Sequence, residues 1–107
     1  MATYSGRFTG RTAIITGGAS GVGRQIAERI TAEGGKVSLW DLNVDALDAA
    51  KSSTGAVHSV AVDVSDYDAV ARAAVLSNTA LGRIDVLVNS AGAVSYTHLT
   101  LPTKRIV

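Results

Sequence analysis

The fold is decided by residues 12–23, which read Thr-Ala-Ile-Ile-Thr-Gly-Gly-Ala-Ser-Gly-Val-Gly. The short β-branched run Thr12–Thr16 is typical of a buried strand, and the glycines close it. Beyond them, Val22, Ile26 and Ile30 recur at a four-residue spacing with charged residues between them. That spacing places one apolar stripe on a helix, so the stretch predicts a strand, a glycine turn and a helix in succession.

The same alternation of short apolar runs and helical patterns continues along the chain. Gly34 and Gly35 end the first helix, and Ser65 is expected to cap the last one, with Asp66 and Asp68 in its first turn. The other predicted elements are strand 36–40, helix 44–51 broken by residues 52–55, strand 56–62, a helix reaching residues 81–82, and strand 84–88. This alternation predicts an α/β fold: a Rossmann-like doubly wound parallel sheet with strand order 3-2-1-4.

Length and composition limit the possible classes of protein. A chain of 107 residues is long enough for one small domain and too short for two. The net charge of +1 gives no electrostatic footprint for nucleic acid, and no run of about 18 apolar residues predicts a membrane span. The sequence has no cysteine, which excludes disulfides, thiolate nucleophiles and cysteine-based metal sites. Residues 1–11 lack the apolar core of a signal peptide, so a cytoplasmic protein is expected.

The glycine turn offers a place for a phosphate. Backbone N–H groups at the start of a helix attract an anion, and side chains would obstruct its approach. Gly17, Gly21 and Gly23 each have a reason to lack a side chain: one lets the turn close, one admits a pyrophosphate, and one lets the helix pack on the sheet. The alternative is an ordinary strand-to-helix turn that happens to contain glycines.

Asp41 closes the second predicted strand at the spacing expected for a ribose contact in a dinucleotide site. Its carboxylate would accept hydrogen bonds from the ribose hydroxyls of the adenosine half. It would also repel a 2′-phosphate, which favours NAD over NADP. Arg24 follows the glycine motif and offers a contact for a 2′-phosphate, so NADP stays open. The alternative for Asp41 is a solvated loop carboxylate.

Four landmarks in this order resemble the classical short-chain dehydrogenase/reductase family. They are the motif Thr16-Gly17-x-x-x-Gly21-x-Gly23, the acidic Asp41, the pair Asp63-Val64 after the third strand, and Asn89-Ser90-Ala91-Gly92, which is similar to the family's Asn-Asn-Ala-Gly with serine at the second position. The resemblance covers residues 6–93, and we expect residues 1–93 to form an NAD(P)-binding half-domain. Taken singly, Asp63 could be a strand-end carboxylate and Asn89 a turn former.

The resemblance implies a set of cofactor-binding residues. The expected contacts with NAD, or less favourably with NADP, are made by Gly17, Ser20, Gly21, Val22, Gly23, Asp41, Leu42, Asp63, Val64, Asn89, Ala91 and Gly92. Asp63 and Val64 would touch the adenine ring, and residues 89–92 would line the cofactor. The resemblance also implies a small carbonyl, alcohol or acyl-carrier-protein thioester as substrate and a dimeric or tetrameric parent protein. It implies no nucleic-acid or membrane partner.

The catalytic residues of that family are not recognisable in this chain. In the family a tyrosine exchanges a proton with the substrate oxygen, a lysine four residues later lowers its pKa, and a serine steadies the oxygen. No tyrosine here has a lysine at that spacing: Tyr4, Tyr67 and Tyr96 are followed by Phe8, Ala71 and Thr100. Ser90 is not the catalytic serine, which belongs much further along the chain. We therefore expect the chain to be inactive as it stands.

Residues 94–107 carry neither the family pattern nor a clear periodicity. Val94–Thr103 resembles the conceptual translation of a transposase sequencing adapter, with Lys104–Ile106 as a variable index and Val107 before a stop. We therefore expect this tail not to belong to the protein's own sequence. The functional alternative makes Tyr96 and His98 an acid/base pair.

Three hypotheses about function follow from these observations. The first is an oxidoreductase that moves hydride between nicotinamide and a carbonyl or secondary alcohol. Phe8–Ala13 resembles both 3-oxoacyl-carrier-protein reductases and sugar or polyol dehydrogenases. We place the reductase ahead of the dehydrogenase, although Asp41 favours the dehydrogenase. The second hypothesis is a non-catalytic nucleotide-binding module. The third is a fragment that does not fold stably, because its fourth strand would expose a pairing edge.

Overall fold

The computed structural model describes residues 6, 8–19, 21–90 and 105–106 of the 107-residue chain. Of the predicted cofactor contacts, Ser20, Ala91 and Gly92 lie outside the described residues, as does most of the tail. The elements run in the order β1 (Thr12–Thr16), α1 (Gly21–Ala32), β2 (Lys36–Asp41), α2 (Val44–Thr54), β3 (His58–Ala61), α3 (Tyr67–Leu81), β4 (Val86–Asn89) and β5 (Arg105–Ile106).

The strands form one parallel sheet in the order β3-β2-β1-β4-β5. The predicted strand order 3-2-1-4 is therefore confirmed. The difference lies at the outer edge of β4, where Arg105 pairs with Val86 and Ile106 with Leu87. The expectation that this edge stays unpaired is wrong at these two positions, because a short parallel strand from the tail supplies the ladder partners.

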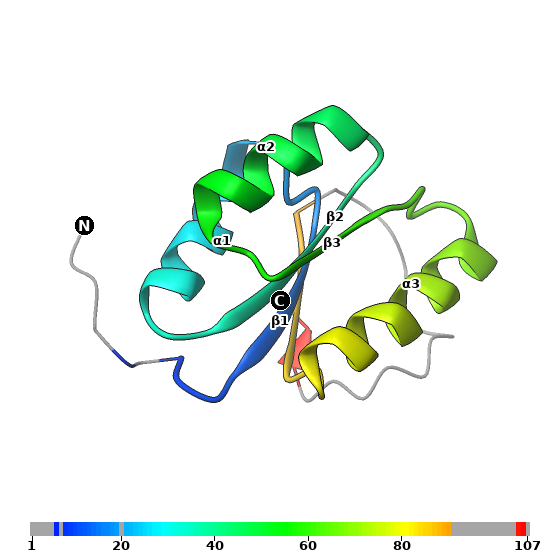
Figure 1. Ribbon diagram of the computed structural model, residues 1–107. Coiled ribbons are helices and arrows are strands. Elements are labelled where there is room, and N and C mark those ends of the chain that lie inside the picture. The colour runs from blue at the N-terminus through cyan, green and yellow to red at the C-terminus, as the bar shows by residue number, and fades with distance from the viewer. Residues whose placement is uncertain (1–5, 7, 20, 91–104, 107) are drawn as a thin grey trace.

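Helices cover both faces of the sheet, with α1 and α2 on one face and α3 on the other (Figure 1). Side chains alternate along each strand, so Ile15 packs with the first pair of helices while Ile14 packs with α3. Both are fully buried, as is Trp40 on the α3 side. Two apolar layers thus sandwich the sheet, which explains why its strands read as nearly continuous apolar runs.

Two helix boundaries differ from the sequence prediction. Helix α2 continues through Thr54 and ends at Gly55, whose φ is +80° and whose N–H donates to the Lys51 carbonyl at 3.2 Å. Helix α3 is capped by Asp66, whose Oδ1 accepts from the Ala69 N–H at 3.2 Å. The prediction of Ser65 as the cap is wrong, because the Ser65 side chain turns back to the Asp63 carboxylate.

The apolar stripe of α1 also differs from the predicted one. Val22 is 66% exposed, and the buried face is made by Gly23, Ala27 and Ile30, with Ile26 packed at its side. Gly23 and Ala27 are small and let the backbone of α1 lie close to the strands. The helix therefore buries the face that carries these small residues rather than the face that carries Val22. Strand β3 is shorter than predicted at both ends, and β4 begins two residues later.

Among the described residues, none of the helices has the length and apolar character that a membrane span requires. The same part of the chain holds no group of three or more His, Cys, Asp or Glu side chains arranged to bind a metal ion.

Candidate functional site

The candidate site lies at the carboxyl ends of the parallel strands. Thr16, the last residue of β1, lies in register between Trp40 of β2 and Asn89 of β4. Asp41 ends β2 one residue further on. Between β1 and β4 the order of the strands reverses, and ligands of doubly wound sheets bind at such a point. The fold therefore brings the predicted turn, acid and asparagine to one edge.

Three of the four glycines in the turn are required by the fold. Gly17 has φ +67°, a conformation that favours glycine. A Cβ on Gly18 would lie 2.8 Å from Leu39 Cδ2 and 3.0 Å from the Ile15 carbonyl oxygen. A Cβ on Gly23 would collide with the Gly17 carbonyl and the Ser90 hydroxyl. These glycines let α1 pack directly on the ends of the strands.

Gly21 is different from the other glycines of the motif. It is the first residue of α1, it is exposed, and a Cβ built on it would meet no atom of the described residues within 4 Å. Helix α1 carries no acidic residue in its first turn. The positive end of the helix dipole therefore faces open space, and an added side chain would fill that space. This arrangement fits an anionic diphosphate.

Asp41 links the end of β2 to the glycine turn. Its Oδ2 accepts from the Ala19 N–H at 3.2 Å, and its Oδ1 accepts from the Asn43 N–H at 3.2 Å. Each carboxylate oxygen can accept more than one hydrogen bond, so both keep capacity for a further donor. The side chain is only partly buried. A polar ligand beside the turn can therefore reach a carboxylate that backbone donors already hold in place.

The predicted adenine contacts, Asp63 and Val64, lie past the end of β3, and Leu42, another predicted cofactor contact, lies past the end of β2. Leu42 is 68% exposed, and Val64 is partly buried beside the core layer of α3. Asp63 is exposed, and hydrogen bonds from the hydroxyl and the N–H of Ser65 hold the pKa of its carboxyl below the ordinary value. The Asp63 carboxylate therefore stabilises the turn between β3 and α3 through Ser65. Leu42 places an exposed apolar side chain at the carboxyl edge of the sheet.

Ser90 and Asn89 join β4 to the end of β1. The Thr16 hydroxyl lies 3.1 Å from Asn89 Oδ1 and 3.3 Å from the Val88 carbonyl oxygen. The Ser90 hydroxyl donates to the carbonyl of Thr16 itself. Because Ser90 also lies against Gly23, one side chain touches both the strand that enters the turn and the helix that leaves it.

Comparison with known proteins identifies the family of this fold and site. The family model described as short chain dehydrogenase matches residues 11–105. The chain belongs to the short-chain dehydrogenase family. Within that family it corresponds to the N-terminal part of the classical type, as the sequence predicted.

Two curated short-chain dehydrogenases illustrate the match. The 2-dehydro-3-deoxy-L-rhamnonate dehydrogenase (NAD(+)) of Sphingomonas sp. (strain SKA58) is 59% identical over 92 residues, covering 86% of this chain and 37% of that enzyme. Levodione reductase of Leifsonia aquatica is 40% identical over 92 residues, covering 80% and 34%. The chain thus spans about a third of the length of the curated relatives it matches.

A solved short-chain dehydrogenase shows the same arrangement in three dimensions. The crystal structure of carveol dehydrogenase from Mycobacterium avium in complex with NAD matches with a TM-score of 0.78 and 28% sequence identity. The match covers 83% of this chain and 38% of that enzyme.

Sequence reasoning missed the roles of Gly18 and Ser90. It explained three glycines and left Gly18 aside, although a Cβ on Gly18 would be crowded by Leu39 and the Ile15 carbonyl. Its position two residues after the end of a buried strand is a signal for close packing on the neighbouring strand. It treated Ser90 only as a departure from the family motif, whereas its hydroxyl fixes the end of β1. No sequence pattern indicates that contact, since 74 residues separate the two partners.

Proposed function

We propose that this chain is the cofactor-binding part of an NAD(P)-dependent oxidoreductase acting on a carbonyl or a secondary alcohol. The observation that carries the proposal is Gly21, the one glycine of the motif that the described fold does not require. A glycine without a packing or conformational reason at the start of a helix favours a ligand that needs the space. The family membership supports the same conclusion.

The residues at the carboxyl edge have separate parts in holding a dinucleotide. The N–H groups at the start of α1 would bind the diphosphate, and Asp41 would accept hydrogen bonds from the ribose hydroxyls of the adenosine half. Leu42, Asp63 and Val64 would border the adenine, and Asn89 would lie on the nicotinamide side of the turn. When bound, the nicotinamide supplies the chemistry of accepting or donating a hydride.

Two features of the chain favour NAD over NADP. A 2′-phosphate next to Asp41 would place two anions together, which is unfavourable. Arg24, the cation that follows the glycine motif, has its Nε 3.7 Å from Glu28 Oε1 on the exposed face of α1. It is therefore partly neutralised by its own helix. The names of the matched enzymes, one specified for NAD(+) and one solved with NAD, support the same preference.

For the substrate, we propose a sugar acid or polyol, the second of the two classes expected from the sequence. The relative that is 59% identical is named for a deoxy sugar acid, and a 40% identical relative is named sorbitol dehydrogenase. These names favour the sugar class over an acyl-carrier-protein thioester, which the sequence had placed first. Since the chain contains no Tyr-x-x-x-Lys, we propose that the 107 residues bind cofactor without turning over substrate.

We also propose that residues 94–107 derive from a sequencing adapter rather than from the protein's own gene. The support is the resemblance of Val94–Thr103 to that translation, residue by residue. A nucleotide sequence that encodes this segment with codons unlike those of the adapter would contradict it.

Calorimetric titration of the 107-residue chain with NAD and with NADP tests the cofactor proposal. We expect NAD to bind more tightly, and we expect Asp41→Ser to reduce that preference by removing the negative charge. Asp48→Ser is the matched control, because Asp48 is an exposed carboxylate on the surface of α2. Tighter binding of NADP by the unaltered chain, or equal effects of the two substitutions, would contradict the assignment of Asp41.

A further inference from the structure

A pocket of about 360 Å³ opens at the other edge of the sheet, where β1, β2 and β4 begin. Three cationic residues line it: Arg11 just before β1, Lys36 at the start of β2, and Arg83 in the turn that leads to β4. Gly10 and Gly82 form part of the rim, and their positive φ angles of +77° and +86° explain why they are glycines. The pocket lies at the opposite ends of the strands from the glycine turn, so the dinucleotide site does not account for it.

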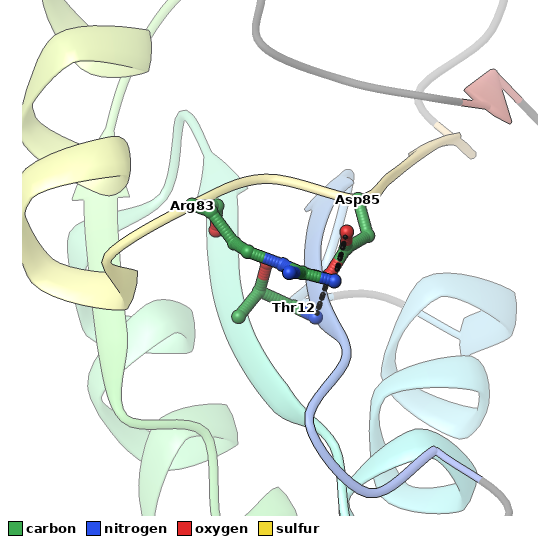
Figure 2. A network of polar contacts seen from close by, with 3 residues as sticks. All are labelled: Thr12, Arg83 and Asp85. Atoms are coloured by element: carbon green, nitrogen blue, oxygen red, sulfur yellow. Dashed lines mark hydrogen bonds and ion pairs between the residues drawn. The ribbon is translucent and has the colours of Figure 1, made fainter.

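Asp85 joins two residues of the pocket lining, Thr12 and Arg83 (Figure 2). The Asp85 carboxylate is buried and accepts from the Thr12 N–H at 3.0 Å, while the Asp85 N–H donates to the Thr12 carbonyl at 3.0 Å. The guanidinium of Arg83 forms two contacts with the same carboxylate, at 3.0 Å from Nε and 2.8 Å from Nη2. A bidentate pair of this kind fixes the plane of the guanidinium, so Arg83 is oriented before any ligand arrives.

The pocket carries a surplus of positive charge. Asp85 compensates one of the three cations, Arg83. Glu33, which precedes Gly34 of the lining, is buried and pairs with Arg29 at 2.8 Å. Arg11 and Lys36 are exposed, and neither side chain forms an ion pair within the described part of the chain. Two positive charges therefore face the pocket without a balancing carboxylate among the residues that the structure describes.

We propose that this amino-edge pocket binds the dianionic phosphate group of a small phosphorylated molecule. The charge of a phosphomonoester matches the uncompensated charge of Arg11 and Lys36, and both side chains are common phosphate ligands. A volume of about 360 Å³ is larger than one phosphate group needs and lies at the lower end of the range for small-molecule pockets. The site is independent of the proposed dinucleotide site, because it uses none of its residues.

An NMR titration of the ¹⁵N-labelled 107-residue chain with glycerol 3-phosphate tests the proposal. We expect saturable shifts of the amide signals of Arg11, Lys36 and Gly82, which lie around the pocket. Glycerol is the neutral comparison and is expected to cause no such shifts. Because the attraction is between charges at an exposed site, the affinity is expected to fall as the salt concentration rises.

Substitutions of the lining cations test whether the phosphate binds in this pocket. Lys36→Gln and Arg11→Gln are each expected to weaken binding about tenfold, equal to about 1.4 kcal/mol. Arg72→Gln, which removes an exposed cation from α3, is the matched control and is expected to leave the affinity unchanged. The proposal is wrong if shifts gather only around Gly21, if glycerol shifts the same signals, or if all three substitutions weaken binding equally. An absence of saturable shifts in the unaltered chain would also overturn it.

Discussion

The hydroxyl of Ser90 donates a hydrogen bond to the backbone carbonyl of Thr16, across 74 residues of sequence. Thr16 is the last residue of β1 before the glycine turn, and Ser90 follows directly after the end of β4. The same serine lies against Gly23, in the first turn of α1. The conformation of the turn therefore depends on Ser90 as well as on its own glycines. A substitution of Ser90 would alter contacts both at the end of β1 and at the start of α1.

The bond between Ser90 and Thr16 is expected to contribute to stability. In Ser90→Ala the Thr16 carbonyl loses its side-chain donor, and the free energy of unfolding is expected to fall by about 1 kcal/mol. Urea unfolding followed by the fluorescence of Trp40, the single tryptophan and a fully buried one, measures this change. Ser52→Ala, at an exposed position of α2, is the control and should change stability little. Equal effects of the two substitutions would contradict the assigned role.

Two glycines of the same motif are expected to respond to alanine in opposite ways. Gly23→Ala forces a methyl group against the Gly17 carbonyl and Ser90, and it is expected to destabilise the fold by about 1–3 kcal/mol. Gly21→Ala places its methyl group in open space, so stability is expected to stay the same or rise by up to about 1 kcal/mol. Urea unfolding of both variants distinguishes them, and a loss of stability in Gly21→Ala would show that the fold itself needs that glycine.

The Asp85 network is expected to hold the starts of β1 and β4 together. In Asp85→Asn the amide oxygen can still accept from Thr12, but the ion pair with Arg83 is lost. Because Arg83 is 54% exposed and can be solvated, we expect a loss of about 1–3 kcal/mol rather than unfolding. Asp48→Asn serves as the control in thermal or urea unfolding. An Asp85→Asn chain as stable as the unaltered protein would show that the ion pair between Asp85 and Arg83 does not stabilise the fold.

His58 is expected to make stability depend on pH. Burial, and secondly the charge of Lys51, lower the pKa of His58 below its ordinary value of 6.5 in the folded chain. Below that pH the unfolded chain binds a proton that the folded chain resists, so the free energy of unfolding is expected to fall as the pH decreases through 6.5. Above this range the contribution of His58 is constant.

Urea unfolding between about pH 5.5 and 8 measures this dependence, in a window above the ordinary carboxyl pKa values. His58→Gln keeps a polar side chain that can still bond the Ser38 hydroxyl, which lies 2.9 Å from His58 Nδ1. We expect this variant to lose most of the slope. A slope that survives in His58→Gln would assign the pH dependence to another group.

Much of the fold could be predicted because local patterns determine it. The β-branched run of β1 and the acid at the end of β2 mark two strand ends without any tertiary information. The boundaries that were wrong depend on contacts that the local sequence does not reveal. Residues 52–54 stay helical up to the cap at Gly55, with the Thr54 side chain buried, and the Asp63 carboxylate diverts Ser65 from capping.

The candidate site was predictable in part for the same reason. Its residues follow strands, and the carboxyl ends of parallel strands meet at one edge, so Gly21 and Asp41 could be placed near each other from the pattern alone. The hydrogen bond from Ala19 to Asp41 and the contact of Ser90 with Gly23 could not, because both depend on the distance between elements after packing.

The affinity of NAD for the 107-residue chain and for Gly21→Ala, measured by calorimetry alongside unfolding, tests the proposed dinucleotide site most directly. The proposed role of Gly21 predicts that the unaltered chain binds NAD. It also predicts that Gly21→Ala, with its stability intact, binds at least about tenfold more weakly because its methyl group fills the space for the diphosphate. Unchanged affinity in a folded Gly21→Ala chain, or no binding of NAD by a folded unaltered chain, would contradict it.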